Sequence, residues 1–121
     1  MRVHLGPYND NGDREVEVII HDYDTWSMDS TLALIIEPML RQLKATTHGG
    51  PVVEAQDLPK DFIFEDSYDN IFSRWDWVLD EMIFTFESIN DGDHYMASDQ
   101  LYARLQNGIR LFTKYYFNLW D

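Results

Sequence analysis

Cysteine is absent from this sequence of 121 residues. Its absence excludes disulfide bonds, thiol nucleophiles and zinc sites built from cysteine. Basic residues are scarce as well, since nine lysines and arginines stand against 22 aspartates and glutamates and give a formal net charge of −13. Because such a chain repels phosphate groups, we expect it to bind neither nucleic acid directly nor an anionic membrane surface.

Long apolar runs are missing too. No segment approaches the roughly 18 apolar residues of a transmembrane helix, and the opening residues, MRVHLGPYNDNG, lack the apolar stretch of a signal peptide. We therefore expect a cytoplasmic protein. Apolar residues nevertheless make up 45% of the chain and aromatic residues 15%, as in a folded protein. The length predicts a single domain over residues 1–121.

Residues 1–23 have the pattern of a β-hairpin. The segments RVHLGPY and REVEVIIH flank NDNGD, a cluster of turn-forming residues that contains Asn11-Gly12. In the second segment Val16, Val18 and Ile20 occupy alternate positions, so one face of the hairpin can be apolar. Since an isolated hairpin is only marginally stable in water, this one must pack on the helices or pair with another chain.

Helical periodicity predicts three helices after the hairpin. The first lies within residues 24–48, a long connection follows over 49–67, and an antiparallel pair of helices occupies 68–121. The predicted fold class is therefore mostly α. Two apolar stripes are expected to face the core: Leu32, Ile35, Ile36, Met39 and Leu43 in the first helix, and Leu101, Leu105, Ile109, Phe112, Tyr116 and Leu119 in the third. Gly108 at the edge of the latter stripe indicates close approach of another helix.

The second helix carries the clearest two-sided pattern. Eight residues form its apolar face: Ile71, Phe72, Trp75, Val78, Leu79, Met82, Ile83 and Phe86. Four acids, Asp69, Asp76, Asp80 and Glu87, form a line opposite that face, and Trp77 and Phe84 flank the line. Large aromatic side chains beside charged residues are typical of protein-binding surfaces, so these six residues form the predicted partner site. The alternative is a solvated acidic face whose two aromatics are covered by the hairpin or by the 50–67 segment.

The segment HDYDTWSMD, residues 21–29, concentrates potential metal ligands before the first helix. The candidates are His21, Asp22, Asp24 and Asp29, whose carboxylates suit a hard divalent cation, although their spacing matches neither an EF-hand nor a zinc motif. We favour a structural interpretation, in which Ser27 or Asp29 caps the helix and the acids lie at the positive end of its dipole. No cofactor is expected, and a divalent metal is the alternative.

Three stretches carry a resemblance to a known family. They are HDYDTWSMDSTLALIIEPMLRQLKATTHGGP, RWDWVLDEMIFTFES and NGIRLFTKYYFNLWD. Together they resemble a family of small, acidic, uncharacterised proteins of tailed, T4-like bacteriophages, including cyanophages. The resemblance implies an origin, namely a phage gene expressed in the cytoplasm of an infected bacterial host, and it implies no activity.

The sequence therefore favours a non-enzymatic interaction protein. The expected partner is a host or phage protein with a basic surface, for example a nucleic-acid-binding enzyme. Association with a second copy of the chain is the alternative. One alternative is a metal-dependent hydrolase or metal-binding protein that uses clustered carboxylates. Another is a virion or assembly component that associates through the edge of the hairpin. The sequence contains no P-loop, GxGxxG or GxSxG motif that would point to a common enzyme class.

Overall fold

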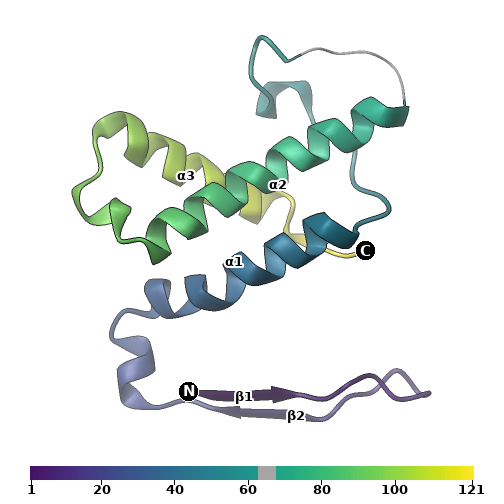
Figure 1. The fold of residues 1–121 in the computed structure, drawn as a ribbon, viewed down its shortest axis with the longest axis vertical. Helices are drawn as coiled ribbons and strands as arrows, with labels where there is room; N and C mark the ends of the chain where they lie inside the picture. The colour runs from purple at the N-terminus through teal and green to yellow at the C-terminus, as the bar shows by residue number, and fades with distance from the viewer. Residues whose placement is uncertain (63–67) are drawn as a thin grey trace. The chain divides into compact units, whose positions relative to one another are not determined.

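A computed structural model of the chain describes residues 1–62 and 68–121, without the side chains of residues 68–71. The described elements follow in the order β1 (Arg2–Leu5), β2 (Val16–Ile19), α1 (Met28–Thr46), α2 (Tyr68–Asn90) and α3 (Asp99–Lys114), with short 3₁₀ helices between them (Figure 1). This order confirms the predicted hairpin followed by three helices. The chain divides into two compact units, the hairpin unit (residues 1–32) and the helical unit (residues 33–121). The single domain over 1–121 stays a prediction.

The hairpin consists of two short strands in an antiparallel ladder. Val3 lies opposite Val18 and Leu5 lies opposite Val16. Because directly opposed residues point to the same side of an antiparallel pair, these four side chains share one face. Every residue of both strands is exposed. The ladder is therefore held by backbone hydrogen bonds and cross-strand contacts, without a buried core of its own.

The turn of the hairpin is fixed by side-chain and backbone hydrogen bonds. The Asn9 side-chain oxygen accepts from the backbone N–H groups of Asn11 and Asp13, both at 3.0 Å. Gly12 has a φ of 80°, a left-handed conformation that glycine adopts without steric strain. The Arg14 guanidinium Nε donates to the carbonyl oxygen of Gly6 at 2.7 Å and so braces the end of the ladder. The turn falls at the cluster NDNGD, as the sequence predicts.

In the helical unit α2 and α3 form the antiparallel pair, and they approach closely at Gly108. A Cβ atom at Gly108 would overlap the side chain of Thr85 and lie 2.9 Å from the carbonyl oxygen of Glu81. The Thr85 hydroxyl, which is fully buried, donates to the carbonyl oxygen of Leu105 at 3.2 Å. Glycine therefore lets the helices come within hydrogen-bonding distance, as its position in the predicted stripe indicates.

The core of the helical unit is built around α2. Its buried members are Trp75, Val78, Leu79, Met82, Ile83 and Phe86 from α2, together with Ala33, Leu40, Val53, Leu58, Leu111 and Tyr115. The α2 residues are those of the predicted apolar face, apart from Phe72, which is half-buried, and Ile71, whose side chain lies outside the described residues. Helical phase alone thus identified the buried face of the central helix.

The third helix is capped by Ser98 and ends before its predicted apolar stripe does. The Ser98 hydroxyl oxygen accepts from the Leu101 backbone N–H at 3.1 Å, which satisfies one free donor of the first turn. The helix ends at Lys114, and Tyr116–Asn118 continue as a 3₁₀ helix. The prediction extended α3 to Leu119 because the apolar spacing continues past the point where the backbone pattern changes.

The connection between α1 and α2 is anchored through Asp57 in the short 3₁₀ helix Ala55–Asp57. The Asp57 side chain is 1% exposed and accepts from Lys114 Nζ at 2.6 Å, Tyr115 hydroxyl at 2.7 Å and Arg110 at 2.9 Å. Burial raises the pKa of the Asp57 carboxyl, but these three donors outweigh burial and hold the pKa below its usual value. The same contact raises the pKa of Lys114 to about 12. This part of the predicted connection is tightly packed, and residues 63–67 lie outside the described part.

Candidate functional site

The predicted acidic line on α2 makes ion pairs with α1. Asp80 binds Lys44 Nζ at 2.6 Å, and Glu87 lies 3.3 Å from the Arg41 guanidinium. Asp76 is half-buried, and the side chain of Asp69 lies outside the described residues. Exposed ion pairs of this kind contribute about 0–1 kcal/mol each. Two of the four acids therefore have partners within the chain, so they are a less open surface than their spacing indicates.

The two aromatics that flank the acidic line are not free anchors. Trp77 is half-buried and packs against the hydrophobic core. The Arg104 guanidinium lies over the Phe84 ring, 3.5 Å from its centroid, and also binds the Glu81 carboxylate at 3.0 Å. The side chain over Phe84 comes from α3, which was not among the covering segments that the sequence suggested. Helical phase places a side chain around one helix but does not reveal which neighbouring helix meets it.

Among the candidate ligands in residues 21–29, Asp24 makes local structural contacts. Asp22–Thr25 form a 3₁₀ helix, and Asp24 accepts from the His21 backbone N–H at 2.7 Å. The Asp24 carboxylate also pairs with the α-amino group of Met1 at 2.8 Å. The hydrogen bond from that amino group, followed by the bond from His21, lowers the pKa of Asp24.

The helix α1 begins at Met28, directly after Ser27, and Asp29 lies in its first turn. Negative charge in the first turn is favourable because the backbone N–H groups there point outward. Within residues 1–62 and the described part of 68–121, no three His, Asp or Glu side chains are grouped as metal ligands would be. The structure shows local contacts for Asp24 and places Asp29 in the first turn of α1, and the choice between a structural role and a metal site stays a prediction.

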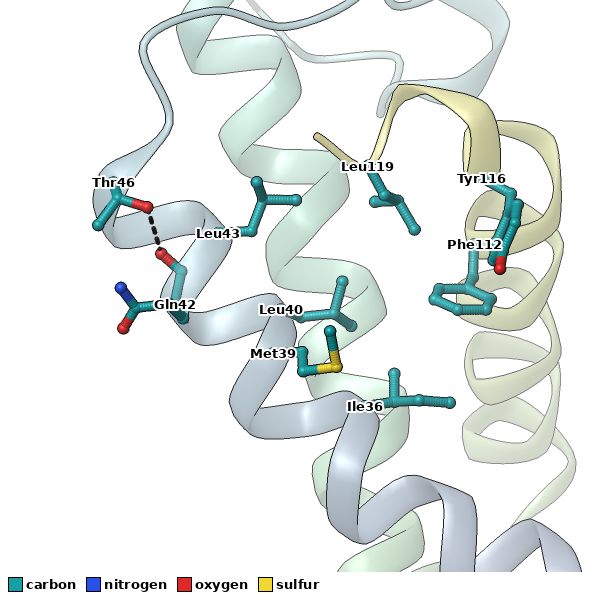
Figure 2. A pocket seen from close by; sticks show the side chains of 9 residues that line it. All are labelled: Ile36, Met39, Leu40, Gln42, Leu43, Thr46, Phe112, Tyr116 and Leu119. Atoms are coloured by element: carbon teal, nitrogen blue, oxygen red, sulfur yellow. Dashed lines mark hydrogen bonds between the residues drawn. The ribbon is translucent and has the colours of Figure 1, made fainter. Parts of the chain in front are cut away.

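An apolar groove of about 700 Å³ lies between α1 and the end of α3 in the helical unit. Nine residues line it: Ile36, Met39, Leu40, Gln42, Leu43 and Thr46 from α1, and Phe112, Tyr116 and Leu119 from the C-terminal part. Figure 2 shows Ile36 and Leu40 pointing from α1 toward Phe112 across the open space. We call this feature the α1–α3 groove.

The groove forms because α1 is held on α2. The Asn90 side chain donates to the carbonyl oxygen of Ala33 and to the Glu37 carboxylate, both at 3.0 Å. The hydrogen bond from Asn90 makes the largest contribution to the lowered pKa of the Glu37 carboxyl. With the ion pairs to Lys44 and Arg41, these bonds fasten three turns of α1 along α2. The side of α1 that faces α3 is left lined by apolar groups.

Most of the groove residues were predicted from the sequence to have another role. Ile36, Met39 and Leu43 belong to the stripe that was predicted to be core, as do Phe112, Tyr116 and Leu119. Met39 and Tyr116 are exposed, whereas Leu40 and Ala33, outside the predicted stripe, are buried. Ile36 and Leu43 are partly buried and pack against the core, as predicted. Leu32, Ile35 and Met39 are exposed, so the predicted stripe was wrong at these three positions.

Comparison with known proteins does not assign this chain to a family. No protein-family model, no curated protein and no solved structure matches this chain. A search of the described helices for a segment of sufficient length and apolarity to cross a membrane finds none. The geometry of the groove and the charge around it are therefore the basis for a functional conclusion.

Proposed function

We propose that the protein is a non-enzymatic interaction protein that binds a basic amphipathic helix of a protein partner in the α1–α3 groove. The observation that carries the proposal is the groove itself, with seven apolar residues among its nine lining residues, in a chain of net charge −13. An amphipathic helix presents apolar residues at positions i, i+3, i+4 and i+7 and fits such a groove.

The shape and lining of the groove support a helix rather than a small polar ligand. Its floor and walls are Leu40, Leu43 and Phe112, and its polar lining is limited to Gln42, Thr46 and the Tyr116 hydroxyl. A polar ligand would need more hydrogen-bonding groups to replace its water contacts. An apolar helix face needs none, and burial of each Leu-sized side chain contributes about 1.5–3 kcal/mol.

Charge supports a basic partner. Residues 33–121 contain 15 acidic and seven basic side chains, so the unit that carries the groove is itself strongly acidic. Complementary charge accelerates encounter and disfavours acidic competitors. Some acids of α2 form ion pairs with Lys44 or Arg41, but acidic side chains still outnumber basic ones in the unit. Its net charge therefore stays negative and attracts a basic partner. We retain the phage origin suggested by the resemblance, which places the partner among host and phage proteins of an infected bacterium.

The proposal is tested with a defined probe. We would titrate a lysine-rich peptide that carries leucine at i, i+3, i+4 and i+7 and measure its affinity by calorimetry, with a scrambled peptide of equal composition as reference. The ordered peptide is expected to bind at least about tenfold more tightly than the scrambled one, since scrambling removes the continuous apolar face. Equal affinity of the two peptides would show that charge alone drives binding and would contradict the proposal.

Two methionine variants provide a matched control on the protein. Met39 lines the groove, whereas Met96, which is 96% exposed, lies in the 3₁₀ helix Asp93–Met96 and is not among the lining residues. Met39→Lys and Met96→Lys change the net charge equally. Met39→Lys is expected to weaken the ordered peptide about tenfold or more, because it loses the burial of one side chain. Met96→Lys should have only the small effect of one added charge.

A further inference from the structure

The hairpin unit carries a second apolar surface that the proposed function does not use. Val3, Leu5, Val16 and Val18 lie on one face of the β1–β2 ladder and are 46–65% exposed. By the same alternation, Met1 and Ile20 continue this face beyond the ends of the two strands, and both are exposed. We call it the hairpin face. We propose that the hairpin faces of two copies of this chain pack against each other to form a two-fold dimer.

The chemistry of the hairpin face selects a second copy as its occupant. Charged side chains of the strands, including Arg2, His4 and Glu17, are on the opposite face, because Arg2 pairs with Ile19 and His4 with Glu17. A basic partner would therefore find no acidic group among the described side chains of the hairpin face. A second copy presents an equally uncharged face, so contact occurs where the repulsion between two chains of net charge −13 is weakest.

Symmetry also favours this pairing. A two-fold dimer needs only one self-complementary patch, and each copy contributes the same residues. Two faces of β-branched and leucine side chains pack in the manner of stacked sheets, which lie about 10 Å apart. A two-stranded hairpin is marginal alone, and stacking covers the side of the ladder that water would otherwise solvate.

The size of the hairpin face sets the expected strength. Strands of four residues span about 13 Å each and lie about 4.8 Å apart, so the contact is smaller than the roughly 1,000 Å² of a stable interface. The dimer is therefore a weak one that forms as protein concentration rises. Salt should strengthen it, because salt screens the repulsion between the acidic chains without weakening apolar contact.

Sedimentation of the full chain over a range of concentrations tests the proposal with a matched pair of variants. Val18 and Ile19 are adjacent exposed residues on opposite faces of β2, and Val18→Glu and Ile19→Glu add the same charge to the same strand. The wild type is expected to dimerise with rising concentration, Val18→Glu to dimerise at least about tenfold more weakly, and Ile19→Glu to resemble the wild type. A wild type that stays monomeric at every concentration, or equal effects of the two variants, would overturn the proposal.

Cross-linking covers the case in which Val18→Glu disrupts the hairpin itself. Because the chain has no cysteine, Val18→Cys and Ile19→Cys each introduce a single thiol. A short bis-maleimide should join two copies efficiently through Val18→Cys and only at background level through Ile19→Cys. Met39→Lys serves as the third arm, since it alters the groove alone. Loss of the dimer in Met39→Lys would place the contact in the groove and contradict the proposal, while an intact dimer leaves the groove free for the peptide.

Discussion

The helical unit and the hairpin unit are stabilised in opposite ways. In the helical unit, α2 is surrounded by a continuous set of buried side chains, and Asp57 adds a buried carboxylate with three donors. In the hairpin unit, both strands are exposed along their length and backbone pairing provides the order. The helical unit therefore has its main stabilising contacts within itself, whereas the hairpin ladder, taken by itself, buries none of the residues of its strands.

This difference shows where the chain keeps surfaces for binding. The helical unit leaves apolar groups uncovered at the α1–α3 groove, where α1 is fastened to α2 by polar bonds. The hairpin leaves a whole face uncovered. The groove is concave and lies in an acidic unit, while the hairpin face is uncharged. The two surfaces thus suit different occupants, and their response to salt should have opposite signs.

The largest expected effect tests the buried network of the helical unit. Asp57→Asn removes the charge that Lys114, Tyr115 and Arg110 share, and it should lower the free energy of unfolding by about 3 kcal/mol. Urea unfolding followed by far-UV circular dichroism measures this loss. A variant as stable as the wild type would show that the network does not hold the unit together.

The same variant has a defined pH dependence. The folded-state pKa of Asp57 is lowered, so its stabilising contribution is fully present above the unfolded pKa of about 3.9 and is lost as the pH falls through the lower folded value. The difference in stability between wild type and Asp57→Asn should therefore shrink in acid. Unfolding curves near pH 7 and near pH 3 measure it, and a constant difference would exclude the carboxylate as its origin.

A smaller effect tests the contact between α2 and α3. Gly108→Ala normally stabilises an exposed helix by about 1 kcal/mol, because glycine is the poorer helix former. Here the added methyl group meets Thr85 and the Glu81 carbonyl, so we expect a loss of about 2 kcal/mol. Gly49→Ala is the matched control, since no atom of the described residues lies within 4 Å of its added Cβ. A stabilising Gly108→Ala would contradict the close approach of the helices.

The smallest effect concerns the ion pairs that hold α1. Asp80→Asn removes the partner of Lys44, and because both side chains are substantially exposed we expect a loss of no more than about 0.5–1 kcal/mol. The loss should diminish with added salt. Thermal melts at low and high ionic strength measure it. If Asp80→Asn destabilised the protein as much as Asp57→Asn, exposed ion pairs would matter as much as the buried network. That result would contradict the account given above.

Sequence periodicity predicted the local features of this fold well. Alternation of Val16 and Val18 predicted a strand, Asn11-Gly12 predicted the turn, and helical spacing predicted the buried face of α2. Each of these depends on residues close together in the chain. The close approach at Gly108 extends this to one tertiary contact, because a glycine in the middle of a helix lowers its stability unless a neighbouring helix needs the space.

The surroundings of the predicted partner site could not be read from the sequence. Trp77 packs on the core and Arg104 covers Phe84, although both aromatics lie outside the apolar arc of their own helix. Asp80 meets Lys44, which is 36 residues earlier in the chain. These contacts are set by how three helices pack, and residue spacing within one helix carries no information about it. The groove was missed for the same reason, since its residues have the spacing of a core stripe.

Methyl NMR of the five methionines tests the central proposal, binding in the α1–α3 groove, most directly. Met39 lines the groove, Met82 is fully buried and Met96 is exposed elsewhere, so the three methyl signals separate groove binding from global change and from nonspecific charge contact. On addition of the leucine–lysine peptide, the Met39 signal is predicted to shift in a saturable manner while the signals of Met82 and Met96 stay nearly fixed. A Met39 signal that does not move, or that moves no more than Met96, would contradict the proposed function.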